Sequence, residues 1–204
     1  TIIGGGVSEN PEQYVHIKET PGFNIGGARQ PAGCTNSLHS HRTAEVFIIH
    51  SGSWRMFWGL EGDDGAVVLN PGDLISLPTH MFRGFENVTP VNATSETGSG
   101  FIFSVLGGDD SGGGVVWAPE VLEEARNHGL TLLESGQLVN TREGEEIPEG
   151  IPPVTPISKT GLSFHSRNTI TDASKFVVKR PGKWAYRETE LIGRSSNAVI
   201  RERP

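Results

Sequence analysis

The sequence predicts an all-β protein, built as an antiparallel sandwich or barrel, and two observations carry this prediction. The 204 residues include 27 glycines and 13 prolines, which is typical of many tight turns between short strands. In the first half of the chain, short β-prone runs alternate with turn signals at a regular interval. Neither a glycine-rich phosphate loop nor an alternation of strands and helices is present in the sequence, so a parallel α/β fold is not expected.

The beginning of the chain predicts an arm followed by one strand. Residues 1–12 are glycine-rich and polar, so we expect little regular structure there. Residues 13–19 alternate, with Val15 and Ile17 on one side, and predict a strand. Residues 22–32 supply turn signals before the next strand.

That next strand contains two histidines and a glutamate on one face. His39, His41 and Glu45 occupy positions of the same parity, and alternate side chains of an extended strand point to the same face. The three side chains can therefore converge on one point, as metal ligands must. Imidazole and carboxylate suit a divalent first-row metal such as iron, manganese, nickel or zinc. Val46 and Ile48 point the other way and need cover from another layer.

Further strands complete the predicted barrel. They are expected at residues 53–58, 66–69, 74–77 and 100–106. Asp64-Gly65 is a strong hairpin turn, and residues 70–73 form another tight turn. Trp54, Met56 and Trp58 share one face, which we expect to serve as core or as a subunit contact.

A long C-terminal extension, residues 107–204, follows the barrel. It begins with a low-complexity glycine run and then predicts one helix at about 119–128, with proline and glutamate in its first turn and a glycine stop. Residues 141–156 are acidic and contain four prolines, so we expect an extended connector. The tail has strand-like pieces at 175–178 and 191–192, and its apolar residues must be buried on the outer sheet of the barrel or on a partner subunit.

Composition excludes several partners. The net charge is −7, from 24 acidic and 17 basic residues, and no cluster of Lys or Arg suggests a nucleic-acid interface. No apolar run approaches the roughly 18 residues of a membrane span, so no membrane association is expected. A single cysteine, Cys34, and a start without a signal-peptide pattern favour a cytoplasmic protein.

The histidine stretch resembles the first motif of the cupin superfamily at every fixed place. It reads Gly33, five residues, His39-x-His41, three residues, Glu45, six residues, Gly52. Five fixed identities at fixed spacing make this resemblance far more specific than a lone His-x-His.

A second stretch resembles the second cupin motif but departs from it at two places. Gly72, Pro78 and Asn87 fall where the family pattern requires them. His80 replaces the inner glycine, and Arg83 replaces the metal-binding histidine. Because arginine cannot lose its proton at any relevant pH, Arg83 is not a normal metal ligand.

Three arrangements of the site remain open. In the first, His39, His41 and Glu45 hold a metal with open positions, and Arg83 binds a substrate carboxylate or other oxyanion bidentately. In the second, His80 bends in to replace the missing ligand, although its offset places it on the opposite strand face. In the third, no metal is bound and Arg83 forms a structural salt bridge with Glu45.

The resemblance covers about residues 33–106 and implies a single jelly-roll β-barrel over residues 13–106, an interior site and a homodimer. We expect a metal-dependent cupin enzyme that acts on a small oxygenated organic molecule, for example a carboxylate. Dioxygenase-like oxidoreductase chemistry is favoured, with iron as the favoured metal. Arg83 would orient the substrate or stabilise negative charge, and His80, if it faces the cavity, would be a general acid or base.

Two alternatives to this function stay open, because one fold hosts many reactions. The first is a cupin isomerase or lyase, in which the metal only polarises a carbonyl. The second is a metal-free protein that binds or senses a small molecule, with Arg83 as the ligand anchor.

Overall fold

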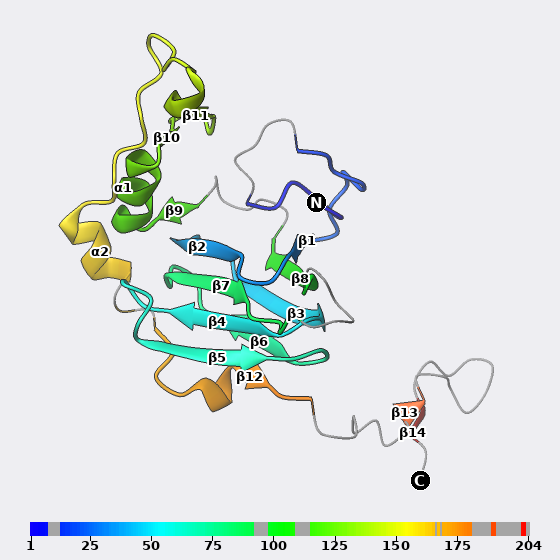
Figure 1. Cartoon of the computed structure of the whole chain (residues 1–204). Coiled ribbons are helices and arrows are strands. Elements are labelled where there is room, and N and C mark those ends of the chain that lie inside the picture. The colour runs from blue at the N-terminus through cyan, green and yellow to red at the C-terminus, as the bar shows by residue number, and fades with distance from the viewer. Residues whose placement is uncertain are drawn as a thin grey trace.

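The computed structural model describes residues 1–7, 13–91, 98–108, 115–165, 167 and 169–180, and the backbone of residues 189–190 and 201–202. Two five-stranded antiparallel sheets form the body of the molecule (Figure 1). Sheet A has the order β1 (Phe23–Gln30), β8 (Gly100–Gly107), β3 (Glu45–Ser51), β6 (Leu74–Leu77), β12 (Val177–Val178). Sheet B has the order β5 (Gly65–Leu69), β4 (Trp54–Trp58), β7 (Arg83–Asn87), β2 (Thr35–Ser40), β9 (Val116–Trp117). The predicted all-β jelly-roll barrel is confirmed.

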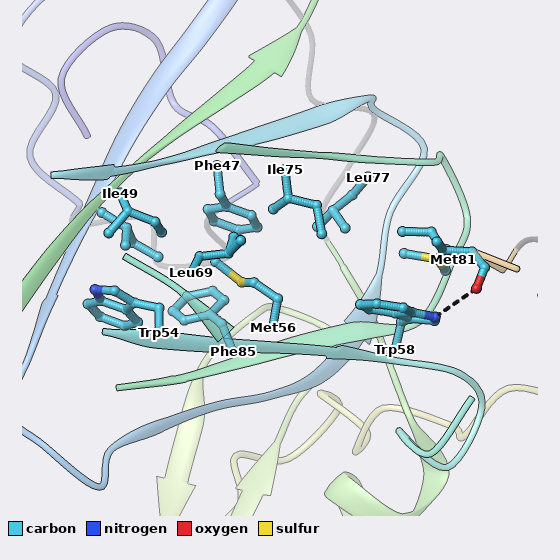
Figure 2. Close-up of a cluster of buried hydrophobic side chains, with 12 residues drawn as sticks. Phe47, Ile49, Trp54, Met56, Trp58, Leu69, Ile75, Leu77, Met81 and Phe85 are labelled. Carbon is cyan, nitrogen blue, oxygen red and sulfur yellow. Dashed lines mark hydrogen bonds between the residues drawn. The ribbon is translucent and has the colours of Figure 1, made fainter. Parts of the chain in front are cut away.

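The core lies between the inner faces of the two sheets (Figure 2). Along β3 and β4 every second residue is buried, as a strand with one inward face requires. Phe47 and Ile49 of β3 meet Trp54, Met56 and Trp58 of β4 in this layer, so the aromatic face of β4 belongs to the core. Each such side chain contributes about 1.5–3 kcal/mol when it is fully buried.

The first strand of the structure is not the one that the sequence predicts. Residues 13–19 form no strand, and Ile17 makes only an isolated bridge to Ile3. Instead β1, where turns were expected, pairs with β8 along its whole length. Gly27 allows this close packing, because a Cβ there would lie 2.6 Å from the ring of Phe101. The prediction was wrong here because a glycine needed for close packing was interpreted as a turn signal.

The extension contains the predicted helix and one that was not predicted. The first, α1 (Pro119–Asn127), agrees with the prediction to within one residue. The second, α2 (Lys159–His165), has only seven residues, with a glycine at position 161. The remaining elements are β10 (Leu130–Leu132), β11 (Leu138–Asn140), the 3-10 helices η1 (Thr141–Glu143) and η2 (Ala173–Lys175), β13 (Thr189–Glu190) and β14 (Arg201–Glu202). No helix in the described part of the chain is long and apolar enough to span a bilayer.

The last part of the extension joins the barrel at the edge of sheet A. β12 lies within the strand-like piece expected at 175–178 and pairs with β6, whereas residues 191–192 fall outside the described residues. This pairing widens the sheet and does not cover its outer face. Ile48 on that face is 39% exposed, so the expected cover for Ile48 is not found among the described residues. On sheet B, the indole of Trp58 donates to the carbonyl of Ile170 at 3.2 Å.

Candidate functional site

The two histidines and the glutamate of the first motif lie at one end of the barrel, where β2 leaves sheet B and β3 enters sheet A. His39 and His41 lie at the end of β2 and just after it, and Glu45 is the first residue of β3. All three are buried, at 6%, 2% and 3% exposure. Nε2 of His41 is 3.2 Å from Oε2 of Glu45, and the rings of His39 and His41 are 6.0 Å apart. The structure therefore brings the three side chains together, but not on one strand as predicted, because β2 ends at Ser40 and Glu45 begins β3 in the other sheet.

Arg83 lies among these side chains. It is 1% exposed, and its Nη2 and Nε donate to Oε2 of Glu45 at 3.0 and 3.3 Å. Its Nη1 donates to the carbonyl of Met81 at 2.9 Å, and Nη2 also contacts Nε2 of His41. Nε2 of His41 thus lies between Nη2 of Arg83 and Oε2 of Glu45. Nδ1 of His41 contacts the hydroxyl of Thr43 at 2.6 Å.

The carboxylate of Glu45 is held in its ionised form. Burial would raise its pKa, but the contact with His41 and the charge of Arg83 outweigh this effect and lower the pKa to about 2. The hydroxyl of Ser104 on β8 donates to Oε1 at 2.6 Å. Arg83 and Glu45 thus form a buried ion pair whose net charge is zero.

His39 is a neutral hydrogen-bond acceptor. Its Nδ1 lies 2.7 Å from the carbonyl oxygen of Ser37 and must donate to it, so Nε2 carries the lone pair. Burial and the charge of Arg83 lower the pKa of His39 to about 4, so the ring is uncharged at neutral pH. The ring lies beside Trp117 of β9, with 5.4 Å between the ring centroids.

The ligand atoms, as they lie, do not fit a divalent metal. Nε2 of His41 and Oε2 of Glu45 both face Nη2 of Arg83, which takes the position that a shared cation would need. Within the described ranges, no three His, Cys, Asp or Glu side chains form a group that could hold a metal ion. The predicted metal site therefore requires Arg83 to move, and the metal stays a prediction.

His80 does not reach this group of side chains. Its backbone has φ of 61°, which is uncommon for a residue other than glycine, and its amide donates to the carbonyl of His41 at 2.8 Å. The ring turns toward α2, with its centroid 5.2 Å from that of Phe164 and 5.8 Å from that of His165. His80 is consequently not placed to replace the missing ligand or to act on a molecule bound beside His39.

A cavity of about 370 Å³ lies on the other side of His39 and Glu45. Ser104 and Asn36 add polar groups to its wall, and Trp117 adds an aromatic ring. Arg83 and His80 do not line it. The sequence missed Asn36, Ser104 and Trp117 as wall residues. Only Ser104 has a signal in the sequence, because it is polar and shares the parity of Ile102 and Leu106 in an apolar run.

Comparison with known proteins gives matches only among solved structures. No protein-family model matches the chain, and no curated protein matches it. An uncharacterised protein with a double-stranded β-helix domain from Klebsiella pneumoniae aligns at 17% identity over 50% of this chain and 75% of that one, with a TM-score of 0.41. An RmlC-like cupin from Shewanella frigidimarina aligns at 19% identity over 42% of this chain and 66% of that one, with a TM-score of 0.34.

A recombinant oxalate oxidase in complex with glycolate also matches, at 19% identity over 50% of this chain and 48% of that one, with a TM-score of 0.40. Several other matched structures carry the name cupin. The matches span about half of this chain, so the description of the fold rests on the chain's own two sheets and on the positions of its motif residues.

Proposed function

We propose that this chain, a cupin by its motifs and its two facing sheets, binds a small oxygenated organic molecule in the cavity beside His39 and Glu45 without a metal. The observation that carries the proposal is the position of Arg83. Its guanidinium contacts both His41 and Glu45, so the atoms that would bind a metal already have a partner. His39 and Glu45 still face the cavity.

Charge balance supports the metal-free form. The single positive charge of Arg83 is matched by the single negative charge of Glu45 in a region closed to solvent. A divalent cation placed there would lie against a buried guanidinium. Moving Arg83 away would separate a buried ion pair, and loss of one partner of such a pair costs about 3–5 kcal/mol. The arrangement without metal needs neither change.

The remaining groups can bind a ligand in a fixed orientation. The neutral ring of His39 offers an acceptor, and its lowered pKa of about 4 makes it a weak base. Asn36 and Ser104 add polar atoms, and apolar side chains form the rest of the wall. A cavity that is mostly apolar, with a few convergent polar groups, is typical of a small-molecule site. Binding or sensing is the function that these groups support best.

The proposal is tested by ligand-induced stabilisation of the metal-free protein. We expect at least one compound of a broad panel of small acids, polyols, sugars and amines to raise the unfolding temperature in the presence of EDTA. Gly26→Val should abolish the shift. Gly26 lines the cavity and a Cβ there would meet nothing within 4 Å, so the valine side chain can enter the space that the ligand needs. Gly107→Val is the control, since Gly107 is exposed and its Cβ would meet only Ala44, at 3.9 Å. Failure of every compound would refute the proposal.

A metal-dependent enzyme is the second candidate, and the convergence of two imidazoles and a carboxylate favours it. His39, His41 and Glu45 would hold a divalent metal such as iron, manganese, nickel or zinc, and Arg83 would turn toward the substrate. The metal would supply dioxygenase-like chemistry, or would polarise a carbonyl in an isomerase or lyase. Close to one metal per chain after purification without chelators, lost on changing His39 and His41 to Ala, would establish this candidate over the first.

A further inference from the structure

The described residues of the cavity wall offer several hydrogen-bond acceptors and include no cationic side chain. Glu45 is ionised, and the hydroxyl proton of Ser104 is already donated to it. Nε2 of His39 is an acceptor, as the bond from Nδ1 to Ser37 requires. Among the described residues that line the cavity there is no lysine and no arginine.

Three polar atoms of the wall are buried without a hydrogen-bond partner. They are Oδ1 of Asn36 on β2, Oε1 of Gln13, which precedes the barrel strands, and the hydroxyl of Thr1, and all three residues line the cavity. A buried acceptor left unsatisfied costs about 1–3 kcal/mol, so such groups are rare unless a ligand or water completes them. Together they indicate a ligand that donates hydrogen bonds to the two amide oxygens and can exchange one with the hydroxyl, as a hydroxyl group of the ligand would.

Arg83 is not available to a ligand carboxylate. Its Nε and Nη2 donate to Glu45 and its Nη1 donates to Met81, and the side chain does not line the cavity. A carboxylate in the cavity would therefore face the ionised Glu45 and unpaired amide oxygens. An ammonium group would gain little from Glu45, because Arg83 already neutralises that charge. The wall thus favours a neutral ligand.

The rest of the wall is apolar and aromatic. Phe47, Phe85 and Trp117 line the cavity together with Ile102 and Leu106. A molecule that places carbon-bound hydrogens against these surfaces and hydroxyl groups toward His39 and Asn36 would satisfy both parts. From this wall we infer that the cavity selects a small neutral polyhydroxylated molecule, a polyol or monosaccharide, over a carboxylate. This inference names the ligand class of the proposed function and rests on it.

Matched pairs of neutral sugars and their acids test the inference on the full chain. Isothermal titration calorimetry in EDTA would compare D-glucose with D-glucuronate and D-galactose with D-galacturonate, which differ by one hydroxymethyl or carboxylate group, and would include myo-inositol and xylitol. We expect at least one neutral compound to bind. If that compound is glucose or galactose, it should bind at least tenfold more tightly than its matched acid. Gly26→Val should abolish this binding and Gly107→Val should preserve it.

Asn36→Leu separates a ligand contact from a structural role. The variant removes an unpaired buried acceptor, so it should weaken binding of the neutral compound about tenfold while leaving the unfolding temperature of the ligand-free protein unchanged or raised. A loss of binding affinity together with a lower unfolding temperature of the ligand-free variant would contradict the role assigned to Asn36.

Two results would overturn the choice of ligand class. One is an acid that binds as tightly as its neutral partner or more tightly. The other is the absence of binding by any neutral compound of the set at tens of millimolar. In either case the proposed function still stands if another compound of the broader panel stabilises the wild type and not Gly26→Val. The proposed function is refuted together with the inference only when no compound of either panel binds.

Discussion

At the scale of single residues, Arg83 decides what the histidines of this barrel can do. Its long side chain crosses from β7 to Glu45 at the start of β3, where both side chains are buried. A histidine at this position would offer a lone pair, whereas a guanidinium offers only donors. The same fold can therefore hold an ion pair where the family pattern holds a metal.

The Arg83–Glu45 pair should show strong coupling in a double-mutant cycle. Arg83→Met and Glu45→Gln are each expected to lower the free energy of unfolding by about 3–5 kcal/mol, because each leaves one buried group without its partner. The double variant should lose much less than the sum of the two. Urea unfolding of the wild type, the two single variants and the double variant measures the coupling energy. Additive losses of unfolding free energy would show that the pair is not coupled.

If the wild type works without a metal, as proposed, Arg83→His should create a metal site. An imidazole at this position would remove the charge beside His41 and add a fourth ligand to His39, His41 and Glu45. We expect the variant to bind one manganese or nickel ion per chain in calorimetric titration, and the wild type to bind neither stoichiometrically. Arg83→Gln controls for simple removal of the charge. Equal binding by wild type and variant would instead favour the metal-dependent candidate.

How far the sequence predicts the site depends on how far apart its parts lie in the chain. Strand parity predicted the convergence of His39, His41 and Glu45 on a single strand, whereas the structure achieves it across the turn that joins β2 of one sheet to β3 of the other. The direction of Arg83 stayed open among three arrangements, because parity does not say how a long side chain turns. Asn36 and Trp117 could not be predicted as wall residues, since it is the pairing of β2 with β9 that brings their strands together.

At the scale of elements, two that the sequence did not predict, β1 and α2, form for a shared physical reason. β1 contains Gly26 and Gly27 and so has weak strand propensity, yet β8 pairs with it over eight residues. α2 is short, and it forms against the barrel, where His165 contacts the hydroxyl of Ser40 at 3.0 Å. In β1 and α2, tertiary contacts outweigh the intrinsic secondary-structure propensity of the segment. In contrast, α1 was predictable from the sequence, because it has proline and glutamate in its first turn.

Asp73 should fasten the C-terminal segment to sheet A in a pH-dependent way. Burial would raise its pKa, but hydrogen bonds from the amides of Asn70 and Arg180 and the ammonium of Lys179 lower it below the ordinary 3.8. A lowered pKa in the folded state stabilises the attachment above about 3.8, and this contribution is lost as pH falls through the lowered value. We therefore expect the segment to loosen in acid.

Hydrogen exchange at the Ser76 amide measures this attachment, because that amide donates to the carbonyl of Phe176 at 2.9 Å. At neutral pH Asp73→Asn should speed its exchange several-fold, and the wild type should approach the variant once the pH is low enough to protonate Asp73, after correction for intrinsic rates. Asp63→Asn, at an exposed turn position, is the control. Unchanged exchange in Asp73→Asn would contradict the role of the carboxylate.

At the scale of the whole molecule, the barrel has one buried layer and one apolar outer face. Phe101 and Phe103 of β8 lie on the outer face of sheet A, half-buried, with their ring centroids 5.8 and 5.9 Å from that of His50 on β3. Ile48 lies opposite Phe103 in the register and is 39% exposed. β12 adds to the edge of this sheet but leaves the face open. Exposed apolar groups gathered on one face are typical of a surface that binds a partner.

The homodimer expected from the family resemblance stays a prediction, and this face is where we expect it to form. A second copy would place the same Phe101, Phe103 and Ile48 against these residues, as a twofold interface requires. Ile48→Lys would bury a charge at the centre of such an interface, which is strongly unfavourable without a partner of opposite charge. Light scattering after size exclusion should therefore give the mass of two chains for the wild type and of one chain for the variant. Val68→Lys, at a 47% exposed position on β5 in sheet B, should leave the dimer intact. A monomeric wild type, or an Ile48→Lys variant as dimeric as the wild type, would rule out this face as the dimer interface.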